Sequence, residues 1–330
     1  MGNLVDSNSD LSPYRPLDAV YEAISTHSKR DDMVLHAIGQ SVEGRPIYAV
    51  QIKGTSEPRG AVLVCANIHG VEFIAVEVAL GLLQRAAEGC SRLKMLLETV
   101  DIWVIPTLNP DAYDRTWQQH GRGVLAELRT NANGVDLNRN FPRPSDAKTT
   151  WLTFGGWRLG SEDPANPFYR GASALSEPET RTLADLHDRV DFIASANLHS
   201  TMGTLIQPRV LSRSVYKQYG RLVNAFRRGQ TRWRYKRMAN MWFDRFTGEQ
   251  EDFQHHCHNT WALCVEHYPV WVKLGRFWPM TPLFWRFNPR DPAPYIESDS
   301  DGILSYFECA LAMPRPNDVP HHKAIVFPGT

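Results

Sequence analysis

The chain has 330 residues, a length that suits one large α/β domain or two small domains. Basic residues (Lys and Arg) and acidic residues (Asp and Glu) number 36 each, so the formal net charge is zero. This balance excludes a globally basic nucleic-acid binder and a highly acidic disordered chain, while the 42% of hydrophobic residues is enough for a substantial core.

The cysteines and the N-terminal stretch indicate the compartment. The 5 cysteines are scattered and form no C-x-x-C pair, which favours a reducing environment over a disulfide framework. The N-terminal stretch MGNLVDSNSDLSPYRP lacks the apolar segment of a secretory signal, and no apolar run approaches the roughly 20 residues of a membrane helix. We therefore expect a cytoplasmic protein with no membrane and no nucleic-acid partner.

Strand-like and helix-like segments alternate along the chain. Ala61–Asn67 is typical of a buried strand, and Ile74–Ala87 after it has apolar residues at helical spacing. Val100–Pro106 is a second strand-like run that ends in proline. A helix and two further strands follow, Glu177–Arg189, Phe192–Leu198 and Thr260–Glu266, and then a C-terminal helical face formed by Ile303, Leu304, Phe307 and Leu311. This alternation predicts an α/β fold with a largely parallel sheet flanked by helices.

Two long stretches between these segments are typical of loops. Residues 140–168 are rich in Pro, Gly, Trp and Asp, and residues 271–295 are rich in Pro and Trp. Loops of this length usually form a binding surface or its rim. Because ligands of open α/β sheets bind outside the carboxyl ends of the strands, we expect functional residues directly after the predicted strands.

Two histidines and one glutamate occupy such positions. His69 and Glu72 form an H-x-x-E pair after the first strand, and His199 follows the third. Two imidazoles and one carboxylate suit Zn²⁺ and leave a fourth position for water. An H-x-x-E pair alone is weak, and its placement after a strand is what strengthens the prediction.

Glu266 ends the fourth predicted strand. A carboxylate in this position, not needed as a metal ligand, could act as general base on a metal-bound water. The alternative role for Glu266 is a structural one, as a salt-bridge partner at the end of a strand.

The string NGVDLNRNFP, Asn133–Pro142, is the most specific in the chain. Asn138 and Arg139 offer an amide and a bidentate guanidinium, which suit a carboxylate ligand. Arg129, at the start of this loop, could stabilise a developing oxyanion. For either arginine alone, the alternative is a solvated surface charge.

The tract His255-His256-Cys257-His258 has the composition of a metal-binding segment. Adjacent side chains usually point in divergent directions, so a single ion rarely binds all of them. The sequence favours a surface loop near the substrate pocket here.

These motifs together resemble those of the zinc metallocarboxypeptidases related to pancreatic carboxypeptidase A, especially their bacterial and cytosolic branch. The matching pieces occur in the family's order over residues 39–266: GQSVEGRPI, HGVE, NPD, NGVDLNRNFP, NLHS and the strand ending in Glu266.

The resemblance implies a role for each matched residue. It implies one Zn²⁺ per chain bound by His69, Glu72 and His199, with Glu266 as general base and acid. Arg129 matches the arginine that polarises the scissile carbonyl. The pair that holds the terminal carboxylate of the substrate is matched by Asn138 and Arg139.

The resemblance also implies the fold, the domain limits and the substrate. The expected fold is a single domain with a mixed sheet of roughly eight strands flanked by helices. We expect a lead-in segment over residues 1–38 and a catalytic domain over 39–330, with the loop 271–295 and a closing helix over 302–313. The implied partner is a peptide or peptide-like substrate with a free carboxylate.

The chain also departs from the family pattern. No tyrosine falls between Lys236 and Glu266, where the family has a tyrosine that closes over the substrate, and Phe246 is near that place. A gapless count back from Glu266 puts Glu251 at the floor of the specificity pocket, with Asp252 beside it. An acidic floor would favour a basic or amine-bearing side chain.

Two other activities remain open. One is an N-acyl amino acid deacylase of the aspartoacylase or succinylglutamate desuccinylase type, which shares the H-x-x-E plus His plan. The other is a γ-D-glutamyl-diaminopimelate amidase acting on murein peptides, because an acid such as Glu251 would suit the extra ammonium group. The full DLNRNFP string favours the carboxypeptidase.

Overall fold

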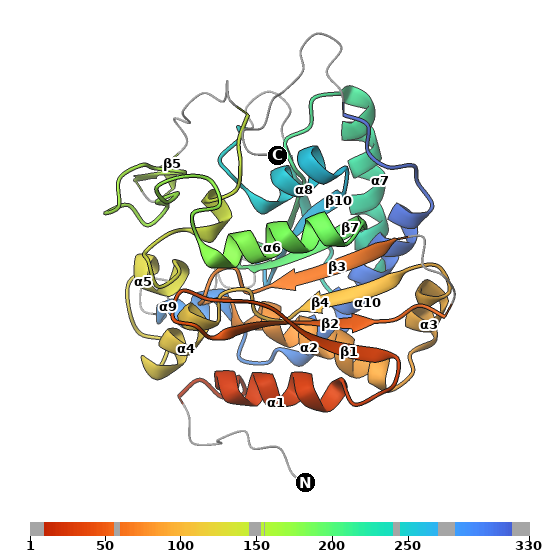
Figure 1. The fold of residues 1–330 in the computed structure, drawn as a ribbon, viewed down its shortest axis with the longest axis horizontal. Helices are drawn as coiled ribbons and strands as arrows, with labels where there is room; N and C mark the ends of the chain where they lie inside the picture. The colour runs from red at the N-terminus through yellow and green to blue at the C-terminus, as the bar shows by residue number, and fades with distance from the viewer. Residues whose placement is uncertain are drawn as a thin grey trace.

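The computed structural model describes residues 10–55, 60–144, 153–154, 156–239, 245–269 and 281–318 (Figure 1). Within these residues an 8-stranded sheet has the order β1-β2-β4-β3-β7-β10-β8-β9. Its strands are β1 (Met33–Gln40), β2 (Pro46–Ile52), β3 (Ala61–Ala66), β4 (Asp101–Ile105), β7 (Phe192–Ser200), β8 (Thr204–Ile206), β9 (Lys236–Met238) and β10 (Trp261–His267). β5 (Thr153–Phe154) and β6 (Trp157–Arg158) form a separate hairpin.

The four central strands, β4, β3, β7 and β10, are parallel, and the flanking strands make the sheet mixed. β3 is buried along its whole length, as expected for a parallel strand covered on both faces. β3 and β7 are neighbours, and the chain leaves them toward opposite edges of the sheet. This is the topological switch point at which α/β sheets place their ligands.

Helices cover both faces of the sheet (Figure 1). The longer ones are α1 (Leu17–His27), α2 (Phe73–Ala87), α4 (Pro110–Gln118), α6 (Pro178–Arg189), α7 (Arg213–Gly229), α8 (Gln250–His258) and α10 (Ala293–Leu311). The shorter ones are α3 (Ser91–Leu97), α5 (Leu125–Arg129), η1 (Leu137–Arg139) and α9 (Leu283–Phe287). None of the helices in the described part of the chain has the length and apolar composition that a membrane crossing requires.

Alternate residues of the strands contribute to two hydrophobic cores. Val62 and Val64 of β3 pack in the core formed with α1, α2, α7 and α10. Leu63 and Cys65 face the second core, formed with α6 and α8. Because successive side chains of a strand point to opposite faces of the sheet, only every second residue of a strand faces α8.

The four strands and two of the helices predicted from the sequence are present with shifts of one to a few residues at their ends. His199 lies inside β7 instead of after it, and α6 begins at Pro178 with Glu177 as its N-cap. The closing helix predicted over 302–313 begins earlier, because α10 starts at Ala293.

Within the predicted loop 140–168, residues 145–152 and 155 lie outside the described residues, and the hairpin of β5 and β6 occupies part of the remainder. Within 271–295, residues 271–280 lie outside the described residues, and the remainder contains α9 and the start of α10. The limit predicted at residue 38 falls inside β1, and α1 before it packs in the same core as α2. The single-domain mixed sheet with flanking helices is confirmed.

Candidate metal centre and active site

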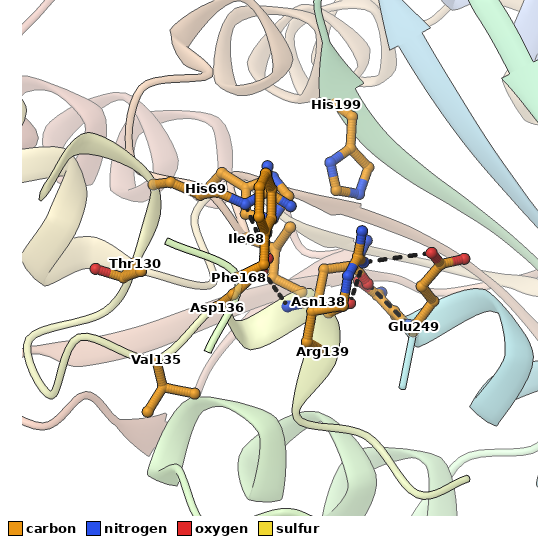
Figure 2. Close-up of polar contacts among 12 residues, drawn as sticks. Ile68, His69, Thr130, Val135, Asp136, Asn138, Arg139, Phe168, His199 and Glu249 are labelled. Carbon is orange, nitrogen blue, oxygen red and sulfur yellow. Dashed lines mark hydrogen bonds and ion pairs between the residues drawn. The ribbon is translucent and has the colours of Figure 1, made fainter. Parts of the chain in front are cut away.

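His69, Glu72 and His199 converge at the switch point between β3 and β7. Glu72 Oε1 lies 3.1 Å from His69 Nδ1, and Glu72 Oε2 lies 3.1 Å from His199 Nδ1. The two imidazole rings have centroids 5.0 Å apart, and Figure 2 shows them on separate segments of the chain. One ligand atom from each residue lies within 4.8 Å of the others, and all three residues are buried.

The backbone after β3 turns sharply to present these side chains. Asn67 has a positive φ of 58°, a conformation that Asn tolerates better than most residues, and its side chain donates to the carbonyl of His69 at 2.9 Å. Gly70 approaches α4 so closely that a Cβ there would lie 2.4 Å from Ala112. Glu72 is then the N-cap of α2, so that H-x-x-E spans one tight turn between a strand and a helix.

The charges at this cluster fit a bound cation. Burial alone would raise the pKa of Glu72, but His69 and His199 lower it to about 2. Burial alone would lower the pKa of His199, but Glu72 raises it to about 9. Glu72 Oε2 is buried, and the described residues give it no partner with hydrogen-bond geometry, although His199 Nδ1 is close. A carboxylate oxygen so placed beside two imidazole nitrogens suits Zn²⁺.

Asp136 supports His69 from the opposite side. Its Oδ1 lies 3.2 Å from His69 Nε2, and its Oδ2 accepts a hydrogen bond from Arg129 Nε at 2.9 Å. A proton on Nε2 leaves the lone pair on Nδ1, the nitrogen that faces Glu72. No role was expected for Asp136 from the sequence, although it lies within the NGVDLNRNFP string.

Arg129 is the last residue of α5, and its hydrogen bond to Asp136 places it close to the metal-ligand cluster. Its guanidinium lies 5.0 Å from the centroid of the Phe168 ring and pairs with Asp136. Burial would raise the pKa of Asp136, but Arg129 and His69 hold that pKa well below its usual range. Arg129 is therefore a paired cation whose side chain is only 12% exposed, and not the solvated surface charge that was the alternative.

Glu266 lies beside His199 in the sheet. The two residues are register partners in the parallel pair of β10 and β7, and Glu266 also pairs with Thr204 of β8. Burial raises the pKa of Glu266, while the nearby His199 opposes that rise. Its Oε2 is buried and has no hydrogen-bond partner among the described residues, and those residues show no salt bridge of the kind that was the alternative.

Asn138 and Arg139 lie on η1, next to Asp136 (Figure 2). Asn138 Oδ1 accepts from the backbone N–H of Gln250 at 2.8 Å, which leaves the amide nitrogen as the donor. Arg139 Nη1 lies 3.3 Å from Glu249 Oε1, so the guanidinium predicted to hold a carboxylate already faces an internal one.

Gly248 makes this arrangement possible. It has a positive φ of 90°, and a Cβ there would lie 2.4 Å from the carbonyl oxygen of Arg139. The loop before α8 therefore packs directly on the backbone of η1, and Phe141 N donates to the Gly248 carbonyl at 3.1 Å. Glu249, which the sequence analysis did not consider, is the residue that this contact places against Arg139.

Glu251 is on the first turn of α8 and is buried. Its Oε1 accepts from Asn197 Nδ2 at 2.9 Å, and it forms a cluster with His199 and Cys264. Burial raises its pKa, and His199 opposes the rise. The structure thus places Glu251 on the same side of the sheet as the metal cluster.

Phe246 is buried and packs on neighbouring side chains. The Arg209 guanidinium lies 5.0 Å from its ring centroid, and the His256 ring lies at 5.3 Å. Part of the stretch in which a tyrosine was sought, residues 240–244, lies outside the described residues.

Comparisons with known proteins agree with this arrangement. A family model described as zinc carboxypeptidase matches residues 21–267. The catalytic chain of carboxypeptidase N from Rattus norvegicus is 33% identical over 193 residues, which cover 55% of this chain and 41% of that protein. The alignment therefore covers less than half of that relative.

Solved structures show the same fold. Carboxypeptidase A from Helicoverpa armigera superposes with a TM-score of 0.72 at 19% identity, covering 93% of this chain and 77% of that one. A metallo-carboxypeptidase from Pseudomonas aeruginosa, in complex with (2-guanidinoethylmercapto)succinic acid, superposes with a TM-score of 0.59 at 19% identity, covering 89% of this chain and 68% of that one.

Proposed function

The chain belongs to the zinc carboxypeptidase family, and from that premise we propose that it hydrolyses the C-terminal amide bond of a peptide or peptide-like substrate. The observation that carries this proposal is the convergence of His69, Glu72 and His199, with Glu266 as a register neighbour of His199. A zinc cluster with a carboxylate beside it supplies the two groups that amide hydrolysis needs.

His69, Glu72 and His199 would hold the ion, the two histidines through Nδ1. Zn²⁺ bound there would act as a Lewis acid and would lower the pKa of a bound water toward about 7. Asp136 keeps His69 in the tautomer that leaves Nδ1 available.

Glu266 would move the proton. The raised pKa of Glu266 lies closer to neutral pH than the pKa of an exposed glutamate does. This suits a group that accepts a proton and then gives it to the leaving amine. Arg129, fixed by Asp136 and Phe168, is near enough to the cluster to stabilise charge on the carbonyl oxygen.

Arg139 and Asn138 would bind the free carboxylate of the substrate. Asn138 offers its amide nitrogen, and Arg139 offers a guanidinium that Glu249 faces in this structure. Recognition of a terminal carboxylate restricts cleavage to the last residue, which makes the enzyme an exopeptidase.

Glu251 would select the side chain of that residue. A buried carboxylate near the metal cluster favours a cationic side chain, such as that of Arg or Lys, or the extra ammonium of diaminopimelate. The guanidino ligand of the Pseudomonas aeruginosa relative is consistent with a cationic group in this fold. The cytoplasmic location stays a prediction.

A substrate panel tests the activity. Purified protein should release the C-terminal residue from peptides ending in Arg or Lys faster than from peptides ending in Leu, and Glu251→Gln should reduce that preference. Faster cleavage of N-acyl amino acids would indicate the deacylase, and faster cleavage of γ-D-glutamyl-diaminopimelate peptides would indicate the murein amidase.

Glu266→Gln tests the mechanism. This variant should bind zinc at the level of the unmodified protein and lose about 10²–10⁴-fold in kcat. Glu162→Gln, which removes one exposed carboxylate, is the control and should leave kcat unchanged. Full activity of Glu266→Gln would contradict the assigned base.

A further inference from the structure

A second group of potential ligands lies on the far end of α8, outside the site described above. His255, His256 and Asp318 each offer one ligand atom, and the three atoms lie within 4.8 Å of one another. The histidines belong to the tract that the sequence analysis placed on a surface loop. The structure instead places them in the last turn of a helix, with His255 only 2% exposed.

His255 has the separation from Asp318 that two ligands of one metal ion require. Its Nε2 lies 3.4 Å from Asp318 Oδ2, which is long for an N–H···O hydrogen bond. Two tetrahedral ligands at zinc bond lengths of about 2.0–2.1 Å are separated by about 3.3–3.4 Å. His255 Nδ1 lies 3.0 Å from the hydroxyl of Tyr219, and a proton on Nδ1 donated to that hydroxyl leaves the lone pair on Nε2.

His256 is oriented by a backbone group. Its Nε2 donates to the carbonyl oxygen of Arg209 at 2.8 Å, which fixes the tautomer with the lone pair on Nδ1. The rings of His255 and His256 are 4.6 Å apart and inclined at 84°, so the two adjacent histidines do not diverge here.

Asp318 is held in place from its other side. Its two carboxylate oxygens accept hydrogen bonds from the backbone N–H groups of Leu211 and Ser212, each at 2.7 Å. Each oxygen has further lone pairs, so these bonds orient the carboxylate without using up its capacity to bind a cation. All three candidate ligands thus have the supporting hydrogen bonds that are typical of protein metal sites.

We propose that His255, His256 and Asp318 bind a second Zn²⁺ ion, with water as the fourth ligand. This ion is distinct from the one expected at His69, Glu72 and His199, so the chain would bind two zinc ions instead of one. The second ion would join the end of α8 to the segment around Asp318, and through Asp318 to the residues before α7. Because Glu251 lies on the first turn of α8, the ion would steady the helix that carries this residue.

Metal binding can be measured without activity. The variant His69→Ala/Glu72→Gln removes two ligands of the first site, and the full-length variant is then stripped of metal and titrated with Zn²⁺ alone. Calorimetry and elemental analysis should show one zinc ion per chain in this variant and two in the unmodified protein. Bound Co²⁺ should give the visible absorption of a tetrahedral site in the same variant.

Single substitutions in that background assign the ligands. His256→Ala and Asp318→Asn should each weaken zinc binding by at least about 10-fold, and Asp318→Asn keeps an oxygen acceptor for one of the two backbone donors. His258→Gln, on the same helix but outside the cluster, is the control and should bind zinc as its parent does. Circular dichroism of the metal-free proteins checks that each variant is folded.

Two results would overturn the second site. One is the absence of stoichiometric zinc in the folded His69→Ala/Glu72→Gln variant. The other is zinc binding that persists unchanged in both His256→Ala and Asp318→Asn. Neither result bears on peptide hydrolysis, which is measured separately with the first site intact.

Discussion

Asp136 joins a proposed metal ligand to a proposed substrate contact through one carboxylate. One oxygen faces His69 and the other accepts from Arg129. The side chain is fully buried, so its charge depends on these partners, on the backbone N–H of Asn138 and on the nearby Arg139. A substitution of Asp136 should therefore affect zinc binding more than any other property of the protein.

We expect Asp136→Asn to weaken zinc binding at the first site by about 10–100-fold, because His69 loses the acceptor that fixes its tautomer. The measurement is the zinc concentration that restores half of the peptidase activity to metal-free protein. Asp111→Asn is the control, since Asp111 is equally buried and pairs with Arg45 but contacts no histidine within the described part of the chain. An equal loss in both variants would contradict a specific role.

Glu249 faces the guanidinium that would bind the terminal carboxylate, so the substrate has to displace it. We expect Glu249→Gln to lower KM by about two- to fivefold and to leave kcat unchanged, since a partly exposed pair of this kind is worth up to about 1 kcal/mol. Steady-state kinetics on one peptide measures both constants. Glu162→Gln removes the same charge farther from the guanidinium and should not change KM. A higher KM in Glu249→Gln would mean that Glu249 positions Arg139 instead of competing for it.

The sequence predicted the residues that follow strand ends and missed those fixed by contacts between distant segments. His69 and Glu266 could be located because a short apolar run precedes each of them. Asp136 and Glu249 could not be given roles, because their importance depends on residues far away in the chain: His69 is 67 positions from Asp136. The approach of Gly248 to η1 has no local sequence signal either.

At the scale of secondary structure, α8 connects both proposed sites. Its first turn carries Glu251, and its last turn carries His255 and His256. The sequence predicted a surface loop over His255–His258, a tract with the composition of a metal-binding segment. The helix forms because Gln250 and Gln254 contact Asn197 of β7, and Phe253 packs in the core beneath α6. Tertiary contacts override the weak local propensity.

His187 on α6 lies against this helix and predicts a pH dependence of stability. It is buried, and Gln254 Nε2 lies 3.1 Å from its Nε2, so the ring accepts that bond in its neutral form. Burial and the nearby His258 hold its pKa well below the usual value. The unfolded chain therefore binds a proton that the folded chain does not, and stability is lost as the pH falls below about 6.5.

Because of His187, we expect the free energy of unfolding to fall by about 1.4 kcal/mol for each pH unit below about 6.5. Urea unfolding of zinc-free protein at pH 7, 6 and 5 measures the slope, and His187→Gln should flatten it. His120→Gln, which removes an exposed histidine, is the control and should leave the slope unchanged. Identical slopes in all three proteins would contradict this account.

At the scale of the whole molecule, residues 10–32, which precede β1, belong to the folded core. Tyr14 donates to the carbonyl of Pro289, and Leu17 packs in the same core as α2 and α10. The sequence predicted only a lead-in here because the segment precedes the recognisable motifs. Its attachment depends on contacts with residues 62 to 275 positions away, for which the sequence carries no local pattern.

The ion pair between Arg15 and Glu77 can be used to test how much this attachment contributes to stability. Arg15 donates two hydrogen bonds to Glu77 of α2, at 2.9 and 2.8 Å, and the Glu77 side chain is only 6% exposed. We expect Arg15→Ala to cost about 3 kcal/mol of unfolding free energy at pH 7, because it leaves a buried carboxylate without its partner. Arg30→Ala is the matched control: it breaks a similar two-bond pair with Asp32, but both side chains are exposed, so the expected cost is below about 1 kcal/mol.

The pH dependence of the unfolding free energy lost in Arg15→Ala shows whether the unpaired Glu77 charge causes the loss. Burial raises the pKa of Glu77, and Arg15 opposes the rise, so removing Arg15 raises that pKa further. A folded-state pKa above the unfolded value gives stability that is present at low pH and is lost as the pH rises through the folded pKa. The deficit of Arg15→Ala relative to the unmodified protein should therefore shrink between pH 7 and pH 5 in urea unfolding. A deficit that stays constant over this range would mean that lost packing of the arginine side chain, and not the uncompensated charge, destabilises the variant.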